Sequence, residues 1–399
     1  MTSHAHHHHQ GGAREHGSPR IRRLLLVAVL PLVLLTLVGV VVLWPSGERT
    51  RASLGIDFPS SFVHAEVTAA DPAACPGDET DLSCRDIRLV LRDGPDEGSE
   101  VTILDTALTR KLAAGDKVVL SVTPDAPPEL RYDITDYDRR GSLLVLGLLF
   151  GGVIVLLGRR RGALALTGLL ASLTVLVGFV LPSILSGNPP LAVAITGSAL
   201  VMLVALYLSH GLNVRTTSAV LGTFASLGIV ALLSLVFVNA TNLTGLGSEE
   251  ALFVNVAAGR INLEGLLLAG IIIGSLGVLD DVTVTQASAV WELHLANPAM
   301  GARDLYRSAV RIGRDHIAST VNTLVLAYAG ASLPLLILFT LSNSQFVDVL
   351  NGEVVAEEVV RTLVGSIGLV ASVPITTGLA ALVAAGDRAP AGGPAARRP

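Results

Sequence analysis

The segment Leu263–Glu292 most constrains the fold, because it is apolar enough to enter a bilayer yet carries two adjacent carboxylates, Asp280 and Asp281. A carboxylate at the centre of a membrane helix costs roughly 2.5–3.5 kcal/mol on insertion scales and usually marks an ion or proton pathway. The alternative is that both aspartates end the span and face water. The segment therefore predicts either a polar site inside a helical membrane bundle or a transmembrane helix whose end, with both aspartates, is exposed to water.

Helical periodicity places the small residues of this segment on one stripe. Steps of four, three and four residues align Gly270, Gly274, Gly277 and Asp281, while the other faces carry Leu, Ile and Val. Gly270 and Gly274 form a GxxxG pattern, which lets a neighbouring helix approach closely. We therefore expect the glycines to pack against protein, and we expect Asp281 to carry the exchangeable proton or cation with Asp280 as its modulator.

The composition is that of a membrane protein. Hydrophobic residues make up 51% of the 399 residues and charged residues only 15%, whereas soluble domains carry about 25% charged residues. We expect a membrane α-helical bundle of eight transmembrane helices. The predicted spans are 20–44, 143–157, 164–185, 191–208, 218–238, 263–292, 317–341 and 359–385.

The segment 45–140, between the first two spans, has a different character. Apolar and polar residues alternate in five short runs separated by Gly, Pro and Asp turns, which is typical of β-strands. Five strands in about 90 residues suit a small barrel of OB or SH3 type. The segment has 19 acidic and 11 basic residues, a net charge of −8 against −5 for the whole chain, which argues against nucleic-acid binding. The predicted strands are 62–69, 86–91, 100–104, 117–122 and 129–134.

Cys75 and Cys84 both lie in this hydrophilic segment. If the segment is outside the cell, a disulfide is expected, and two free thiols are the alternative. We expect no metal site there, because no His or second Cys pair lies near. The His tract at His4 and His6–His9 predicts a solvated tail or a weak metal binder.

Positive charge gathers in alternate links of the chain. The arginines of Arg159–Arg161, His210–Arg215 and Arg303–Arg314 mark cytoplasmic links by the positive-inside rule. The chain is then a multi-pass protein of the cytoplasmic membrane with both termini in the cytoplasm. The expected parts are a disordered tail 1–19, a first helix 20–44, an extracytoplasmic β domain 45–140, a seven-helix membrane domain 141–386 and a disordered tail 387–399.

One cytoplasmic link has helical character of its own. Asn297-Pro298 predicts a helix start, and Arg303, Arg307 and Arg311 recur at helical spacing. This is typical of an amphipathic helix at the membrane surface, or else of a solvated basic face. The next span carries Asn322 and Thr323, which we expect to supply oxygen ligands or a relay to the two aspartates.

Two motifs resemble a known family. Residues 115–118 (GDKV) with 132–140 (YDITDYDRR), and residues 274–293 (GSLGVLDDVTVTQASAVWEL), are similar to the YibE/F family of bacterial multi-pass membrane proteins. The resemblance covers about 65–385 and implies a membrane protein, without naming a substrate. The order of glycine-rich helix, aspartate pair, Arg-bearing helix and Thr-rich helix is also similar to the proton-conducting half of the RND and SecD/SecF superfamily, although those proteins have six spans in each half.

Two functions of different classes fit these features. The first is a proton- or ion-coupled transporter of a small solute, with Asp280 and Asp281 at the coupling site. The second is a membrane scaffold whose β domain binds an envelope protein, with the aspartates in a structural role. The expected protein partner is an envelope protein or a second copy of the chain. An intramembrane aspartyl protease is disfavoured, because it needs aspartates on two helices. We expect no enzyme activity, no cofactor, and contact with the lipid bilayer.

Overall fold

The chain folds into two compact units in the computed structural model. One unit is Leu54–Leu156, here called the β unit; the other, here called the membrane unit, combines Met1–Ser53 with Leu157–Pro399. Most of the tails predicted at 1–19 and 387–399 lies outside the described residues. The structure describes residues 18–46, 61–75, 84–106, 111–124, 126–127, 130–258, 261–341 and 345–387.

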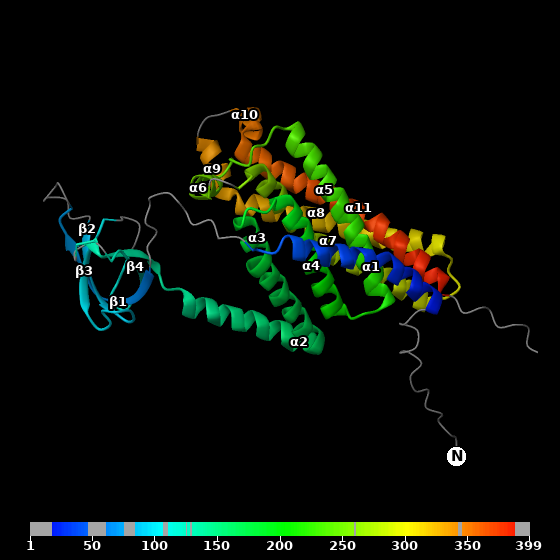
Figure 1. The fold of residues 1–399 in the computed structure, drawn as a ribbon, viewed down its shortest axis with the longest axis horizontal. Coiled ribbons are helices and arrows are strands. Elements are labelled where there is room, and N and C mark those ends of the chain that lie inside the picture. The colour runs from blue at the N-terminus through cyan, green and yellow to red at the C-terminus, as the bar shows by residue number, and fades with distance from the viewer. Residues whose placement is uncertain are drawn as a thin grey trace, which may run out of the picture. The chain divides into compact units, whose positions relative to one another are not determined.

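The β unit is built on one antiparallel sheet with the order β3-β2-β1-β4-β5, which curls into a small half-barrel (Figure 1). Alternate residues point inward along each strand, so Ile87, Leu89, Val118 and Leu120 are fully buried. The strands are β1 Ser61–Ala73, β2 Cys84–Leu91, β3 Glu100–Asp105, β4 Lys117–Val122 and β5 Tyr132–Tyr137.

Four of the five strands lie close to where alternation predicts them, and the fifth is shifted. The prediction of 129–134 is wrong in its start, because β5 begins at Tyr132. Leu130 and Arg131 form a turn in which the Leu130 amide donates to the carbonyl of Pro127. A disulfide joins Cys75 to Cys84, with the two Cα atoms 5.1 Å apart. Cys84 forms the last pair of β1 and β2 with Ala73, and Cys75 follows Ala73 by two residues.

Helices make up the rest of the described chain. Six of them, taking Arg140–Leu185 as one, are long and apolar enough to cross a membrane, and a bent pair raises the number to seven. The helices are α1 Pro19–Val42, α2 Arg140–Val175, the π-helical turn η2 Leu176–Val180, α3 Leu181–Leu185, α4 Pro190–His210, α5 Val214–Ala240, α6 Glu249–Ala258, α7 Leu263–Ala296, α8 Ala302–Ala331, α9 Leu333–Leu341, α10 Phe346–Asn351 and α11 Glu353–Gly386.

The stretch Arg140–Leu185, predicted to form two spans, is 46 residues of helix with a kink that falls between the two predicted spans. At about 1.5 Å per residue, the length summed along its helical segments is roughly 69 Å, about twice the thickness of a bilayer core. The break falls at Arg159, whose backbone is non-helical with φ 51° and ψ −127°. A positive φ is unfavourable for a residue with a side chain. The helix is therefore interrupted at this one residue.

The Arg-bearing segment and the next predicted span differ from expectation. They form one continuous helix, α8, which begins at Ala302 rather than at Asn297-Pro298. α8 ends before Pro334, and α9 continues at an angle of 62° to it. Proline explains the bend, because it cannot donate a helical hydrogen bond and clashes with the preceding turn.

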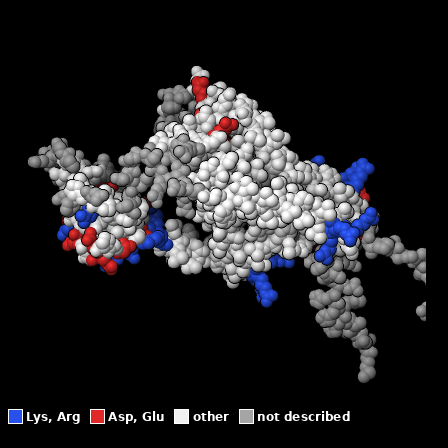
Figure 2. All heavy atoms as spheres, in the orientation of Figure 1, with Lys and Arg blue, Asp and Glu red and all other residues white. Residues whose placement is uncertain are grey.

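The centre of the membrane unit is the packing of α5, α7 and α11 against one another, with α4 and α8 against α7 (Figure 1). Small residues allow this close approach. A Cβ at Gly222 of α5 would meet the Thr376 hydroxyl of α11, and a Cβ at Gly365 of α11 would lie 3.1 Å from Ser275 Oγ of α7. Between its two ends, the visible surface of the membrane unit is nearly free of charged residues (Figure 2).

Candidate functional site

The two adjacent aspartates occupy the middle of α7 and have different surroundings. Asp280 lies 17 residues from the first residue of the helix and 16 from the last, or about 25 Å from each end. Its Oδ1 atom is buried and has no hydrogen-bond partner among the described residues. The Asp281 side chain is 72% exposed, and its Oδ2 lies 4.0 Å from His316 Nε2 of α8. Asp280, rather than Asp281, is therefore the enclosed carboxylate.

The helix face that carries Asp280 packs against apolar side chains. Leu276 and Val284, one turn before and one turn after Asp280, belong to a cluster with Met202 of α4 and Val220 of α5. A carboxylate oxygen without a partner in such surroundings carries the full cost of desolvation, so this position is expensive for the fold to maintain. Such a cost is typical of functional positions in membrane helices.

Hydroxyl groups connect α7 to α5 directly after Asp280. The Thr283 hydroxyl donates to the backbone carbonyl of Asp280 at 3.2 Å and lies 2.7 Å from the Thr223 hydroxyl. Thr223 also contacts the Ala219 carbonyl at 3.0 Å. Both threonines are fully buried. The pair is therefore a polar contact in the interior of the bundle, one turn from the enclosed carboxylate.

A buried amide continues this polar region toward α8 and α11. Gln286 is fully buried, and its Oε1 accepts a hydrogen bond from Thr377 of α11 at 3.0 Å. Within the described part of the chain, Gln286 Nε2 and Thr376 Oγ1 are buried without hydrogen-bond partners. A Cβ at Gly313 of α8 would lie 2.8 Å from both polar atoms of Gln286, so only glycine leaves room for the amide.

These groups form a polar region inside the bundle, here called the polar layer, which extends along α7 from Asp280 to Gln286. Thr223 lies nine residues after the start of α5, and Thr376 lies ten residues before the end of α11, so each is about 13–15 Å from that end of its helix. Three helices, α5, α7 and α11, contribute to this layer. It consists of Thr223, Asp280, Thr283, Gln286, Thr376 and Thr377.

The prediction that Gly270, Gly274 and Gly277 pack against another helix is wrong for Gly270 and Gly277 among the described residues, and only Gly274 of the three meets a neighbouring helix, α8. Gly270 and Gly277 have nothing within 4 Å of a built Cβ, and Gly274 meets only the Tyr328 hydroxyl at 3.5 Å. The buried face of α7 is the one that carries Ile272 and Leu279. Periodicity defines the stripe but does not show which stripe faces protein, because apolar side chains pack against helices as readily as against lipid.

Asn322 and Thr323 also lie away from the aspartates. Both are exposed, and the Thr323 hydroxyl donates to the Ser319 carbonyl of its own helix at 3.0 Å. The α8 face that packs against α7 carries Ile317 and Val321 instead. The expected relay from α8 is therefore not present among the described contacts of these two residues.

Sequence reasoning missed Thr223, Thr283, Gln286 and Thr377. Gln286 had a usable signal, since a primary amide inside an apolar helix needs a partner. The threonines had none, because a membrane threonine commonly satisfies its hydroxyl within its own helix, as Thr223 also does toward Ala219. Among the described residues, no group of three or more His, Cys, Asp or Glu side chains could hold a metal ion.

The apolar helices and their polar interior define an α-helical, multi-pass membrane protein that carries a small β unit. Residues 146–386 match the model of the YibE/F-like protein family. This is more than half of the chain, so the chain belongs to the YibE/F-like family, which confirms the resemblance seen in the sequence. The match begins at residue 146, and the motifs at 115–118 and 132–140 lie outside it. No curated protein and no solved structure matches the chain.

Proposed function

We propose that the protein is a proton-coupled transporter of the cytoplasmic membrane in which Asp280 takes up and releases the proton. One observation carries the proposal: the buried Oδ1 of Asp280 has no hydrogen-bond partner among the described residues, at the middle of a helix apolar enough to span a membrane. A structural carboxylate would be expected to have donors around it. A carboxylate that cycles between two protonation states cannot be permanently paired.

The surroundings of Asp280 supply groups for proton access from two sides. Asp281 and His316 lie near each other on the exposed side of α7 and α8. On the bundle side, Thr283 and Thr223 form a hydroxyl pair one turn along the helix. Hydroxyls both donate and accept hydrogen bonds, so they can pass a proton on without holding a charge. The polar layer would thus connect an exposed entry to the bundle interior.

The topology that we propose has eight spans with both termini in the cytoplasm. Its support is the length of Arg140–Leu185, which suffices for two crossings separated at Arg159, and the bent pair α8–α9, which counts as one crossing. The three arginines at 159–161 would then lie in a cytoplasmic link. The β unit would be extracytoplasmic, and its strand order, with β3 approaching β5, supports an OB-type barrel.

Carbodiimide labelling tests the role of Asp280 without knowledge of the solute. A membrane-permeant carbodiimide reacts with carboxyls that are sheltered from water, so we expect mass spectrometry of the intact protein to find the adduct on Asp280 and not on Asp281. Asp280→Asn should abolish labelling. Asp304→Asn, at an exposed position in the first turn of α8, is the matched control and should leave it unchanged.

A flux measurement then tests the function itself. In liposomes that contain the protein and an internal pH dye, a potassium diffusion potential should drive proton entry. We expect Asp280→Asn to reduce this entry at least ten-fold, and Thr283→Val to slow it because the hydroxyl pair with Thr223 is lost. Wild-type flux in Asp280→Asn would reject the transporter and favour the scaffold, with the β unit carrying the function.

A further inference from the structure

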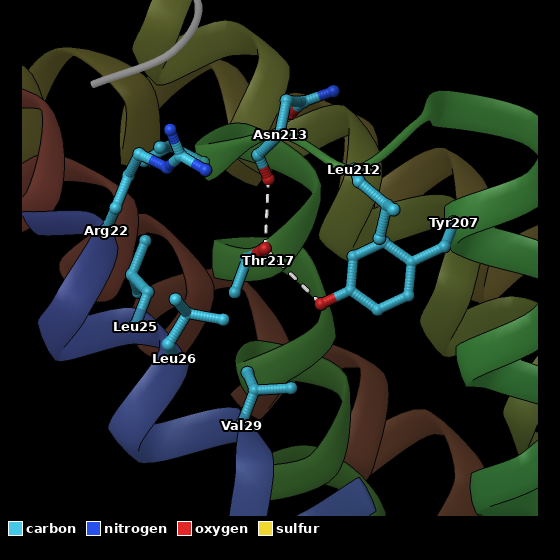
Figure 3. A pocket seen from close by; sticks show the side chains of 9 residues that line it. Arg22, Leu25, Leu26, Val29, Tyr207, Leu212, Asn213 and Thr217 are labelled. Atoms are coloured by element: carbon cyan, nitrogen blue, oxygen red, sulfur yellow. Dashed lines mark hydrogen bonds between the residues drawn. The ribbon is translucent and has the colours of Figure 1, made fainter. Parts of the chain in front are cut away.

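A pocket of about 370 Å³ lies between the first turns of α1 and the facing ends of α4 and α5. This size is within the range of small-ligand sites, about 300–1,000 Å³. In Figure 3, the α1 side chains stand on one side of the pocket and those of α4 and α5 on the other. The lining residues are Arg22, Leu25, Leu26, Val29, Tyr207, Leu212, Asn213, Val214 and Thr217.

Most of the lining is apolar, and it is continuous with a surface that faces lipid. Leu26 lines the pocket and is 62% exposed, and its neighbours on α1, Leu24 and Val27, are similarly exposed. Leu25 and Val29 form the inner wall and are buried. A water-soluble ligand would meet little polar surface here. A hydrocarbon chain can enter sideways from the bilayer and replace other lipid contacts.

The polar groups of the pocket lie at one end. The Arg22 guanidinium has no ion pair or hydrogen bond among the described residues, and it points toward the Asn213 end of the pocket (Figure 3). The Thr217 hydroxyl donates to the Asn213 carbonyl at 2.9 Å and lies 3.3 Å from the Tyr207 hydroxyl. The hydroxyls are therefore already engaged with each other and with the backbone, so Arg22 is the group left to bind an anion.

Further arginines lie near this pocket, at the same end of the membrane unit. Arg20 and Arg23 lie in the first turns of α1, and Arg215 lies in the first turn of α5. Among the described residues that line the pocket, none is a carboxylate. Basic residues near a membrane surface attract anionic lipids by about 1 kcal/mol each. The charge thus complements an anionic headgroup rather than a zwitterionic one.

We propose that this pocket binds one anionic phospholipid, with its phosphate at Arg22 and an acyl chain along Leu25, Leu26 and Val29. An apolar cavity open to the lipid face, with one unpaired guanidinium at the level of the helix ends, matches the two parts of that molecule. The proposal does not depend on transport, because it concerns α1, α4 and the start of α5 rather than the polar layer.

Native mass spectrometry of the full chain in neutral detergent tests the proposal. Phosphatidylglycerol and phosphatidylcholine with identical acyl chains are each added to delipidated protein. We expect phosphatidylglycerol to bind at least three-fold more tightly. Arg22→Gln should weaken its binding about five-fold, since one basic contact is worth about 1 kcal/mol. Arg20→Gln, an exposed arginine outside the pocket, is the control and should change binding less than two-fold.

A second pair of variants tests the acyl-chain part. Leu26→Trp should fill the pocket and weaken phosphatidylglycerol binding at least five-fold. Leu24→Trp, on the same helix and equally exposed but outside the pocket, should have no effect. Both sites face outward, so the variants should fold, which size-exclusion chromatography verifies. Three outcomes would overturn the proposal: equal losses in Arg22→Gln and Arg20→Gln, unchanged binding in Leu26→Trp, or displacement of the lipid by millimolar inorganic phosphate.

Discussion

The β unit and the membrane unit differ in how they treat polar and apolar side chains, although both have apolar cores. In the β unit, Leu89 and Leu120 are fully buried, while charged residues pair on the surface, as Arg92 does with Glu66 at 2.7 Å. In the membrane unit, Thr283 and Gln286 are fully buried. Large apolar side chains of the membrane unit instead face outward, such as Leu30, which is 55% exposed, and Leu232, which is 63% exposed.

The difference shows that burial has a different energetic meaning in each unit. In the β unit, removing apolar surface from water drives folding, at about 25 cal/mol per Å². In the membrane unit, lipid is as apolar as leucine, so packing of small residues and hydrogen bonds between helices hold the bundle together. Equivalent substitutions should therefore have unequal effects in the two units.

The largest difference is expected for truncation of a leucine. Leu120→Ala should destabilise the β unit by about 2–5 kcal/mol, because it leaves a cavity in a closed core. Leu232→Ala, on the exposed face of α5, should change stability by less than about 0.5 kcal/mol. Urea unfolding of the segment 54–142 measures the first, and thermal unfolding of the full chain in detergent measures the second. Similar losses of stability in Leu120→Ala and Leu232→Ala would contradict the proposed difference between the two units in what burial contributes.

Loss of the disulfide should have the next largest effect, and only in the β unit. Cys75→Ser with Cys84→Ser should cost about 2–3 kcal/mol, because a loop with a sequence separation of 9 is no longer closed in the unfolded chain. The same urea unfolding measures the cost. The melting temperature of the membrane unit should not change, and a parallel loss there would show that the units are energetically coupled.

A methyl group at Gly313 should disturb the membrane unit where the polar layer is packed. In Gly313→Ala the new Cβ would lie 2.6 Å from Val373 and 2.8 Å from Gln286, which should cost about 1–2 kcal/mol, in the lower range for overpacking. Gly330→Ala is the matched control on the same helix, since nothing lies within 4 Å of its Cβ. Thermal unfolding in detergent compares the two, and an equal melting temperature would mean that α8 is not held against Gln286.

The smallest effect concerns surface charge in the β unit at low pH. Hydrogen bonds from the Arg140 side chain lower the pKa of Asp138 from 3.8 to about 2, and the His64 backbone amide lowers the pKa of Asp93. A lowered folded-state pKa contributes stability above about pH 3.8, which is lost as the pH falls through about 2. The melting temperature of the segment 54–142 should therefore fall between pH 4 and pH 2, and it should fall less in Asp138→Asn. An identical pH dependence in this variant would assign the loss to other groups.

The two units also differ in how far the sequence could predict them. The alternation of apolar and polar residues predicted four strands of the β unit to within a few residues. In a strand with one face on the core and one in water, every second side chain is apolar, so the pattern is visible in the sequence. The fifth strand was misplaced because Leu130 and Tyr132 continue an apolar alternation across a turn. The sheet order and the half-barrel closure depend on long-range pairing, which no local pattern contains.

In the membrane unit, the sequence predicted apolar helices and a carboxylate pair within one of them, but not which aspartate is enclosed or which helix face meets protein. The stripe Gly365, Gly368, Ser372 and Thr376 of α11 is buried, whereas the similar stripe Gly270, Gly274 and Gly277 of α7 is exposed. Both have the same small-residue spacing, so the composition of a stripe alone cannot tell them apart. The α11 stripe is covered because α5 and α7 pack against it, and this packing depends on the tertiary fold.

α8 is one uninterrupted helix, and this restricts the insertions and deletions that it can accept. Its basic half exposes Arg303, Arg307, Arg311 and Arg314, while its later half directs Ile317 and Val321 toward α7 and α11. Because no loop separates the halves, inserting one residue between them would turn everything that follows by about 100° and point the apolar side chains elsewhere. Seven inserted residues, close to two full turns, would nearly restore the phase. Insertions and deletions in α8 should therefore be tolerated best at lengths of about seven or eleven residues, which are close to whole numbers of turns.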